Sequence, residues 1–548
     1  MIANSYNHYF VTEFLSILFL LYAEIHYTIK GIYSRLKMKE PEIIADVPRR
    51  LDPGAALPVL ILVKDAHLHP IRLHGVHIEI RNRENVQSER CHFDNLQIAA
   101  PWWHHILQIT PGQNFRGPLQ VEVAIEFTCG DRKRVVKSDN YVRTSHTPFE
   151  VFIAGQTMPR SPGWYFGEFH CHTSYTSDQV EFGAPPHASA LLARAMGLSF
   201  FCATDHSYDL DDQPDNYLRS DPDLTKWKSL LAEIGRLNQD LSDFVIVPGE
   251  EVSVGNAQNR NVHFLVLNHP EFLPGAGDGA EKWLQTTPDL SIPEVLAKIN
   301  GQAVAFAAHP CTKPPFPEWL LVRRGNWEWR DCHHARLDGL QIWNGTRDGL
   351  EEGKALWVRL LLEGRRLFIS GGNDAHGNFN RFRQVGWPFL TMRENHRHLF
   401  GVVRTGVLLA DGLSLPTLSE GFKAGRMIVT NGPFINITFH NAAGETARLG
   451  DEISGNNHLL VLECISTAEF GFLQQVRVYR GNLVTRREEV LFTKESFSNP
   501  FQNSEAIPIE ESSAPCYVRA ELYSKTPTQT LMCLTNPIWV NTGHGQKP

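Results

Sequence analysis

The sequence predicts an α/β domain, built on a parallel sheet or an α/β barrel, between two β domains. Between about Trp164 and Phe400, short apolar runs alternate with amphipathic helical stretches, as in "ASALLARAMGLSFFCATDH". Before and after this region, apolar and polar residues alternate one by one, which is typical of half-exposed strands. At 548 residues the chain is also too long for one hydrophobic core, so three or four domains are expected.

The first segment is apolar and then basic. The run "YFVTEFLSILFLLY" is interrupted by Glu13 and is shorter than the roughly 20 apolar residues that a spanning helix needs. It has no basic leader and no small-residue cleavage site, which argues against a signal peptide. The basic stretch "KGIYSRLKMK" follows. We therefore expect a helical packing segment over residues 1–40, with peripheral membrane contact through residues 9–40 as the alternative.

The flanking β domains are predicted from strands that expose one face. "VEVAIEF" on the N-terminal side, and "QVRVYRG" and "YVRAELY" on the C-terminal side, alternate as such strands do. Turn signals such as "NG" and "SG" separate the C-terminal runs. After the helical segment, the predicted domains are a sandwich-like β domain at 41–157, the α/β domain at 164–400 and a β-sandwich at 425–548.

Charge and cysteine content limit the partners and the compartment. A net charge of −8 gives no basic excess with which to bind nucleic acid, so no nucleic-acid partner is expected. The nine cysteines are scattered and form no CxxC pair, which is typical of free thiols in a reducing compartment. We therefore predict a cytoplasmic protein, with membrane association as the alternative.

The stretch "GEFHCHTSYTSD" carries the first candidate ligands. In a strand, residues i and i+2 point to the same face, so His170 and His172 would share a face and Cys171 would point away. Further His, Asp and Glu residues stand within or after later buried-type strands. In α/β folds such positions meet at one rim of the sheet. These residues are Asp205, His206, Glu250, Glu251, His263, His309, Asp374 and His376, and they join Asp178, which is expected on the turn after the first strand.

These residue types suit divalent cations. Imidazole is a good ligand for zinc and iron, and carboxylate for manganese. The set is larger than one ion can use, so two or three metal ions (Mn, Zn or Fe) are expected as cofactors. Paired ions about 3.5–4 Å apart can bridge a hydroxide and neutralise an oxyanion.

The motifs "HCHTSYTSD", "ATDH", "GEEV", "VHF", "AHP" and "GNDAH" occur in this order and resemble those of the PHP (polymerase and histidinol phosphatase) metallohydrolases. That resemblance implies a distorted seven-stranded β/α barrel, similar to a TIM barrel, with a two- or three-metal site. Asp205 is expected to orient His206. Of the candidate residues, His206, His309, Asp205 and Glu251 are also assigned to catalysis. The metal ligands that the resemblance implies are His170, His172, Asp178, His206, Glu251, His263, His309, Asp374 and His376.

The later part of the chain extends this resemblance. "LQIWNG", "GFKAGRMIVTNGPFINI" and "CLTNPIWV" resemble the CehA/McbA-like branch of longer PHP proteins. An amidohydrolase barrel also begins with HxH, but it usually uses a carbamylated lysine and lacks the terminal DxH pair. Glu251 and "GNDAH" therefore favour the PHP family.

The resemblance implies a metal-dependent hydrolase of a small-molecule ester, with a phosphoester as the first substrate class. A metal-bridged hydroxide would attack the ester. The alternatives are a carboxylic or carbamic ester hydrolase of the CehA/McbA type and a non-catalytic protein that docks on a membrane or glycan. Four basic residues near the motifs, interpreted singly as surface charges, are candidates for binding an anionic substrate: Arg260, Lys313, Arg381 and Arg383.

Overall fold

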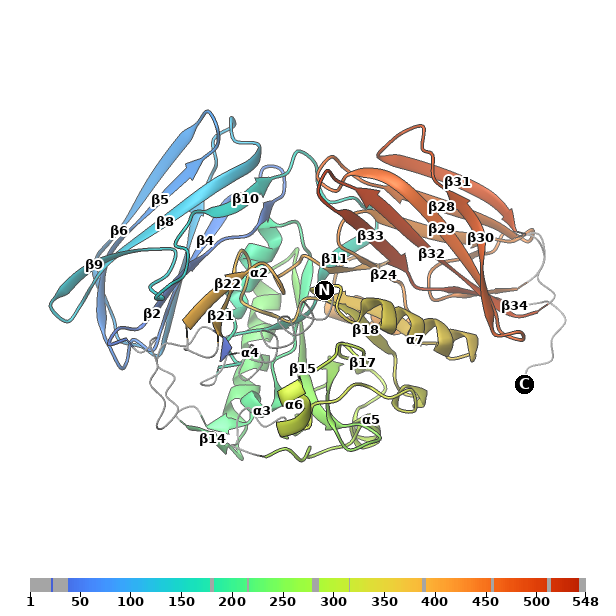
Figure 1. Ribbon diagram of the computed structural model, residues 1–548, viewed down its shortest axis with the longest axis horizontal. Helices are drawn as coiled ribbons and strands as arrows, with labels where there is room; N and C mark the ends of the chain where they lie inside the picture. Colours follow the sequence, from blue (N-terminus) through green and yellow to red (C-terminus); the bar gives the residue numbers. More distant parts are fainter. Residues whose placement is uncertain are drawn as a thin grey trace, which may run out of the picture.

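The computed structural model describes most of the chain in nine ranges. These ranges are residues 21–22, 38–177, 182–213, 216–277, 285–314, 316–386, 391–454, 458–509 and 514–541. Strands dominate, and helices are few and short. Two groups of strands, blue to cyan and orange to red in Figure 1, lie on either side of a middle region that carries the helices.

The N-terminal strands form two sheets that share one core. One sheet has the order β3-β10-β8-β5-β6, with β9 beside β8, and the other has the order β2-β4-β7. Alternate residues of β4 and β8, such as Ile61 and Val123, point into the common core. The strands are β2 Glu42–Asp46, β3 Arg50–Leu51, β4 Leu57–Lys64, β5 Ile71–Arg81, β6 Val86–Ile98, β7 Trp102–Ile109, β8 Gly117–Cys129, β9 Arg132–Lys137 and β10 Phe149–Ile153.

The middle region mixes strands with helices and with one 3-10 turn. Its strands are β11 Trp164–His172, β12 Phe200–Ala203, β13 Asp212–Gln213, β14 Asn216–Ser220, β15 Val245–Gly255, β16 Asn261–Leu267, β17 Val304–Ala307, β18 Gly339–Asn344, β19 Phe368–Gly372, β20 Ala375–His376, β21 Phe382–Gly386, β22 Thr391–Asn395 and β23 Arg404–Leu408. Its helices are α2 Pro186–Ala195, α3 Ser207–Leu210, α4 Thr225–Asp240, α5 Ile292–Lys298, α6 Phe316–Leu321, η1 Asp331–His333, α7 Leu350–Leu362 and α8 Leu415–Lys423.

The prediction of a closed seven-stranded β/α barrel, similar to a TIM barrel, is wrong. The strands instead follow the open path β19-β18-β17-β16-β15-β12-β11, which belongs to a 16-stranded sheet. β12 pairs with one edge of β11, and the other edge pairs antiparallel with β23 and, at Cys171 and His172, with the two-residue strand β20. The chain therefore has a mostly β architecture rather than a TIM-like α/β one.

A hairpin in the middle of the region explains this difference. Only residues 256–260 separate β15 from β16, whereas a parallel crossover needs a dozen residues or more. β16 accordingly runs antiparallel to both β15 and β17. The run "NVHFLVL" has the composition of a buried parallel strand, and the short connection before it is what makes the pairing antiparallel.

The C-terminal strands extend the same sheet and add a second layer. From β23 the sheet continues β24-β33-β32-β29-β30, and a sheet of order β26-β25-β28-β31 packs on it through alternate residues such as Ile437 and Leu460. The strands are β24 Met427–Thr430, β25 Phe434–His440, β26 Thr446–Ala447, β27 Glu452–Ser454, β28 His458–Ile465, β29 Phe472–Asn482, β30 Arg487–Lys494, β31 Gln502–Ile509, β32 Cys516–Lys525, β33 Thr530–Thr535 and β34 Ile538–Asn541.

Little of the predicted N-terminal helix falls within the described residues. Of residues 1–37, the structure describes only the strand β1 Leu21–Tyr22, which pairs antiparallel with β21. Those two residues and residues 38–40 are therefore not helical, and the rest of the expected segment lies outside the described residues. In the described ranges, every helix is too short or too polar to cross a membrane.

Asn536 joins the two halves of the large sheet. Its side chain is fully buried, and its Oδ1 accepts a hydrogen bond from the Ile369 N–H of β19 at 2.7 Å. Its Nδ2 donates to the carbonyl oxygens of Ile369 and Met427 at 3.1 and 3.2 Å. This amide satisfies the edge of β19, which in a closed barrel would pair with β11.

We expect Asn536→Leu to lower the free energy of unfolding by about 3 kcal/mol, because it leaves buried backbone groups of β19 without partners. Urea unfolding followed by circular dichroism measures this loss. Gln529→Ala, at an exposed turn position, is the control and is expected to change stability by less than about 0.5 kcal/mol. Equal stability of the Asn536→Leu protein and the wild type would contradict the role of Asn536.

Candidate metal centre

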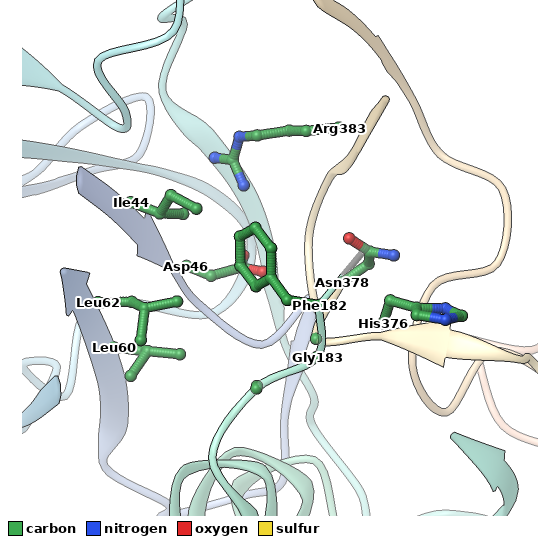
Figure 2. A pocket seen from close by; sticks show the side chains of 11 residues that line it. Ile44, Asp46, Leu60, Leu62, Phe182, Gly183, His376, Asn378 and Arg383 are labelled. Atoms are coloured by element: carbon green, nitrogen blue, oxygen red, sulfur yellow. The ribbon is translucent and has the colours of Figure 1, made fainter. Parts of the chain in front are cut away.

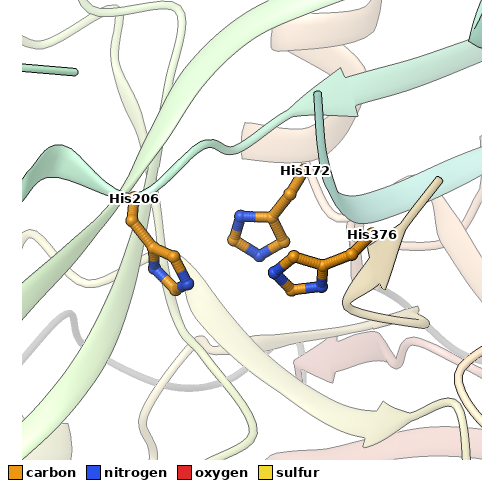
Figure 3. Close-up of side chains that lie close together, drawn as sticks. All are labelled: His172, His206 and His376. Carbon is orange, nitrogen blue, oxygen red and sulfur yellow. The ribbon is translucent and has the colours of Figure 1, made fainter. Parts of the chain in front are cut away.

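Two strands bring three histidines into contact. His170 and His172 are fully buried at the end of β11, on one face of the strand. Cys171 lies on the other side, where its Sγ contacts the Cys202 carbonyl. β20 pairs parallel with β11 so that His376 lies directly beside His172, and their rings stack with centroids 4.0 Å apart. Figure 3 shows these two rings facing His206, which follows β12.

Glu251 lies at the centre of the cluster. Its Oε2 is 3.3 Å from His170 Nε2, 3.4 Å from His172 Nε2 and 3.1 Å from His206 Nδ1. Its Oε1 is 2.6 Å from His263 Nδ1 and 3.2 Å from His309 Nε2. One carboxylate thus touches five imidazoles from four segments of the chain.

The β15–β16 hairpin places part of this set. Glu251 is opposite Leu265, and Ser253 is opposite His263. Glu251 and Ser253 share a face of β15, so His263 is the diagonal neighbour of Glu251 on that face. The antiparallel pairing therefore creates the shortest of the five contacts between Glu251 and an imidazole.

The ionisation of the cluster is strongly coupled. Burial alone would raise the pKa of Glu251, but the neighbouring His263 and His170 outweigh burial and hold it well below its usual range. Burial would likewise lower the pKa of His170, yet Glu251 and Asp374 raise it to about 9. Burial lowers the pKa of His309, and Glu251 offsets only part of that effect.

Asp374 forms a second carboxylate edge of the site. Its Oδ1 is 3.0 Å from His172 Nε2 and 3.5 Å from His170 Nε2. Asn344 Nδ2 donates to its Oδ2 at 3.2 Å. Asp374 has φ 54° and His309 has φ 29°, and residues other than glycine rarely adopt such positive φ angles. Backbone held in this region is concentrated at functional sites.

The arrangement fits bound cations. Glu251 Oε2 and His170 Nε2 are buried and lie 3.3 Å apart, but neither atom makes a well-aligned hydrogen bond with the described residues, so both can contact a cation. Three overlapping sets have donor atoms close enough to share an ion, and each pair of sets shares one residue, which is His172, His206 or Glu251. They are His172, His206 and His376; His170, His172, Glu251 and Asp374; and His206, Glu251 and His263.

Eight of the nine ligands predicted from the motifs thus come together, and the ninth, Asp178, lies outside the described residues. Asp205 was expected to orient the His206 ring, but its carboxylate contacts other groups. Its carboxylate accepts from the Thr173 N–H at 2.7 Å, the Thr173 hydroxyl at 2.9 Å and the Thr176 N–H at 2.9 Å. Asp205 therefore fixes the turn that follows His172. This makes it a positioning residue.

Glu250 faces away from the cluster, as its place beside Glu251 in a strand requires. Its carboxyl group accepts from the Ser207 hydroxyl and the Leu273 N–H. Burial raises its pKa to about 8, so at neutral pH it is largely an uncharged acid. The pKa values of two adjacent glutamates of one strand are thus shifted in opposite directions.

Three neighbours of the site were not singled out from the sequence. Arg324, half-buried in the loop after α6, contacts His263 Nε2. Gln341 Oε1 lies 2.9 Å from His170 Nδ1, and Gln341 Nε2 donates to Asn344 Oδ1 at 3.1 Å. Gln341 and Asn344 both come from the "LQIWNG" strand, where a buried amide three residues before the strand end is a usable signal for support of a metal-binding histidine.

The four basic residues near the motifs divide into two pairs. Lys313 is exposed, and Arg260 stacks on the Trp319 ring with 4.3 Å between the guanidinium carbon and the ring centroid. Arg381 and Arg383 are buried, so their interpretation as surface charges is wrong. Arg383 Nε donates to Asp139 Oδ2 at 2.7 Å, which ties β21 to the N-terminal region.

Comparison with known proteins gives no family. No family model and no curated protein matches the chain. Among solved structures, the chain aligns with the Bacteroides uniformis beta-glucuronidase at 10% identity and TM-score 0.15, over 91% of this chain and 60% of that one. A glycosyl hydrolase family 2 member from Bacteroides cellulosilyticus aligns at 9% identity and TM-score 0.18, over 91% and 78%. Activated alpha-2-macroglobulin from Escherichia coli aligns at 9% identity and TM-score 0.15, over 96% and 25%.

These scores are too low to show a shared fold. The chain spans three fifths of the length of the first of these proteins. The likeness to PHP metallohydrolases thus stays a prediction from the motifs, and the argument for function rests on the site.

We expect millimolar Mn²⁺ or Zn²⁺ to raise the melting temperature of the chelator-treated protein by about 5 °C, because an ion that binds the folded state stabilises it. Glu251→Gln removes the shared charge and should abolish most of this rise. Glu250→Gln is the matched control, since Glu250 is buried on the same strand but faces away, and should keep the rise. Thermal unfolding with elemental analysis measures both effects, and equal metal content in the two variants would contradict the assignment of Glu251.

Proposed function

We propose that the protein is a metal-dependent hydrolase that acts on ester bonds. The observation that carries the proposal is the contact of Glu251 with five imidazoles in a buried cluster that also includes Asp374. A docking protein has no need of so many buried ionisable groups around one point. Histidine and carboxylate ligands in this proportion suit Mn, Zn or Fe.

Divalent ions held by these residues would lower the pKa of a water molecule and neutralise negative charge that develops on the substrate. The chain itself orients its ligands through their outer contacts. Gln341 fixes the orientation of the His170 ring, and Asn344 fixes the orientation of the Asp374 carboxylate. Asp205 fixes the backbone of the turn after His172. Each of these contacts limits the rotation of a side chain that would otherwise adopt several rotamers.

Arg324 is the cation best placed to meet an anionic group of the substrate. It contacts the outer nitrogen of His263, while the other ring nitrogen faces Glu251. A guanidinium at this position stabilises negative charge on an oxyanion without changing its own protonation state. We therefore assign Arg324 to charge stabilisation.

A phosphoester is the first substrate class, because several cations and Arg324 would together compensate the charge of a phosphoryl group. A carboxylic or carbamic ester is the second candidate, since a partly apolar cavity adjoins His376 (Figure 2). Both classes react by attack of an activated water on an electrophilic centre, so one site would serve either class.

We expect the metal-loaded protein to hydrolyse at least one of p-nitrophenyl phosphate, bis-p-nitrophenyl phosphate and naphthyl methylcarbamate. His170→Ala should lower kcat by at least about a thousandfold, because it removes a buried ligand from the centre. Circular dichroism should show an unchanged fold. Metal-loaded protein that turns over none of these esters would contradict the proposal and would support a docking role instead.

Arg324→Ala should lower kcat/KM by about 100-fold, as expected when one charge-stabilising group is lost. Arg323→Ala is the matched control, because the neighbouring Arg323 donates to the Asn259 carbonyl in a more exposed position. Steady-state kinetics with the best of the three esters measures both. Equal losses in the two variants would show that Arg324 acts only through the loop.

A further inference from the structure

The N-terminal strands β2 and β4 are buried on both faces. Ile43 and Ala45 of β2 point into the core of the N-terminal sheets, and Ile61 of β4 does the same. The alternate residues Ile44 and Leu62 are also buried but point the other way, because side chains alternate along a strand. A sheet at the surface of a sandwich normally exposes this outer face. Here the outer face is turned toward the candidate metal centre.

A cavity of about 40 Å³ lies between this outer face and His376. One water molecule needs roughly 10–15 Å³ of such space, so the cavity has room for a small chemical group. Figure 2 shows the apolar side chains on one side and His376 on the other. The lining side chains that the argument uses are Ile44, Asp46, Leu62, Phe182, Asn378 and Arg383.

The charges that line the cavity are already balanced. Arg383 donates to Asp139 and to the Ala45 carbonyl, and it also lies near Asp46. Burial raises the pKa of Asp46 to about 6, although Arg383 opposes that effect. Arg381 also lies near Asp46 and Asp139, so two guanidinium groups face two carboxyl groups and the cavity offers no excess positive charge to a phosphate dianion.

One polar group in the cavity lacks a partner. Asn378 is 7% exposed, and its Nδ2 has no hydrogen-bond partner among the described residues. A buried N–H donor without a partner costs free energy, which a ligand that carries an acceptor oxygen would recover. The cavity therefore combines an apolar wall with one donor placed for such an oxygen.

The N-terminal region also holds the segment that carries His376. Asp46 Oδ2 accepts from the Phe379 N–H at 2.9 Å, and Asn380 Nδ2 donates to the Glu150 carbonyl at 2.8 Å. The wall of the cavity and the candidate ligand are therefore fixed to each other, so a group bound in the cavity has a defined position relative to the metal centre.

We propose that this cavity binds the uncharged, apolar group of the ester substrate, and that the N-terminal β sheets thereby select the substrate. The preferred substrate is a phosphodiester or a neutral ester with a small alkyl or aryl group next to an acceptor oxygen, not a phosphomonoester. This proposal rests on the proposed function, because the reacting centre of the substrate must lie at the metal cluster.

The test compares substituents of increasing length in the metal-loaded full-length protein. The substrates are ethyl and butyl p-nitrophenyl phosphate, and p-nitrophenyl acetate and hexanoate for the carboxylic case. The wild type should prefer the shorter member of the pair that it hydrolyses. Leu62→Ala enlarges the cavity and should shift kcat/KM toward the longer member by at least about fivefold, mainly through KM. Asn378→Ala should lower kcat/KM for both members.

Ile61→Ala is the matched control, because it removes a similar volume from the same strand on the opposite face and should leave the preference within about twofold. Calorimetric titration with ethylphosphonate and butylphosphonate measures the same shift without turnover. If Leu62→Ala does not fold, Ile44→Val supplies the enlarged cavity. If Leu62→Ala and Ile61→Ala turn over the esters with the same chain-length preference, the cavity assignment alone is overturned. If the wild type turns over no ester, both the cavity assignment and the proposed function are overturned.

Discussion

The contact between Glu251 and the surrounding imidazoles constrains the rest of the structure. A fully buried carboxylate is unfavourable unless positive charge or hydrogen-bond donors surround it. The five histidines that satisfy Glu251 come from β11, β12, β16 and β17 or from the residues that follow these strands. The strands must therefore curl far enough to bring their ends around β15. The sheet achieves this without closing, because β23 rather than β19 takes the free edge of β11.

Because the sheet is open, the backbone groups at the edge of β19 and the segment after His376 must find partners in the flanking regions. Asn536 from the C-terminal region accepts from and donates to the backbone of β19, and Asp46 and Asp139 from the N-terminal region hold the segment after His376. Both flanking regions thus contribute directly to the shape of the site. The N-terminal sheet also supplies an apolar wall beside His376. This explains why its outer face, which in an isolated sandwich would be solvated, carries Ile44 and Leu62.

The sequence predicts which side chains lie together better than it predicts the fold. Histidines and acids at the ends of buried runs are a local signal, and the structure gathers eight of the nine predicted ligands. The barrel was wrong because strand composition does not reveal strand direction. That direction is determined by the short connection before His263. Arg324 was missed because a lone arginine in a long loop has no local pattern, and the burial of Arg383 depends on Asp139, which is 244 residues away.

The central claim is that the cluster around Glu251 binds metal ions. The most direct measurement is anomalous X-ray diffraction from crystals grown with Mn²⁺ or Zn²⁺, recorded above and below the absorption edge of the metal. The account predicts at least two anomalous peaks within about 2.5 Å of the donor atoms of Glu251, His172 and His206. A map without a peak at these atoms, with the imidazoles hydrogen-bonded directly to Glu251, would contradict it.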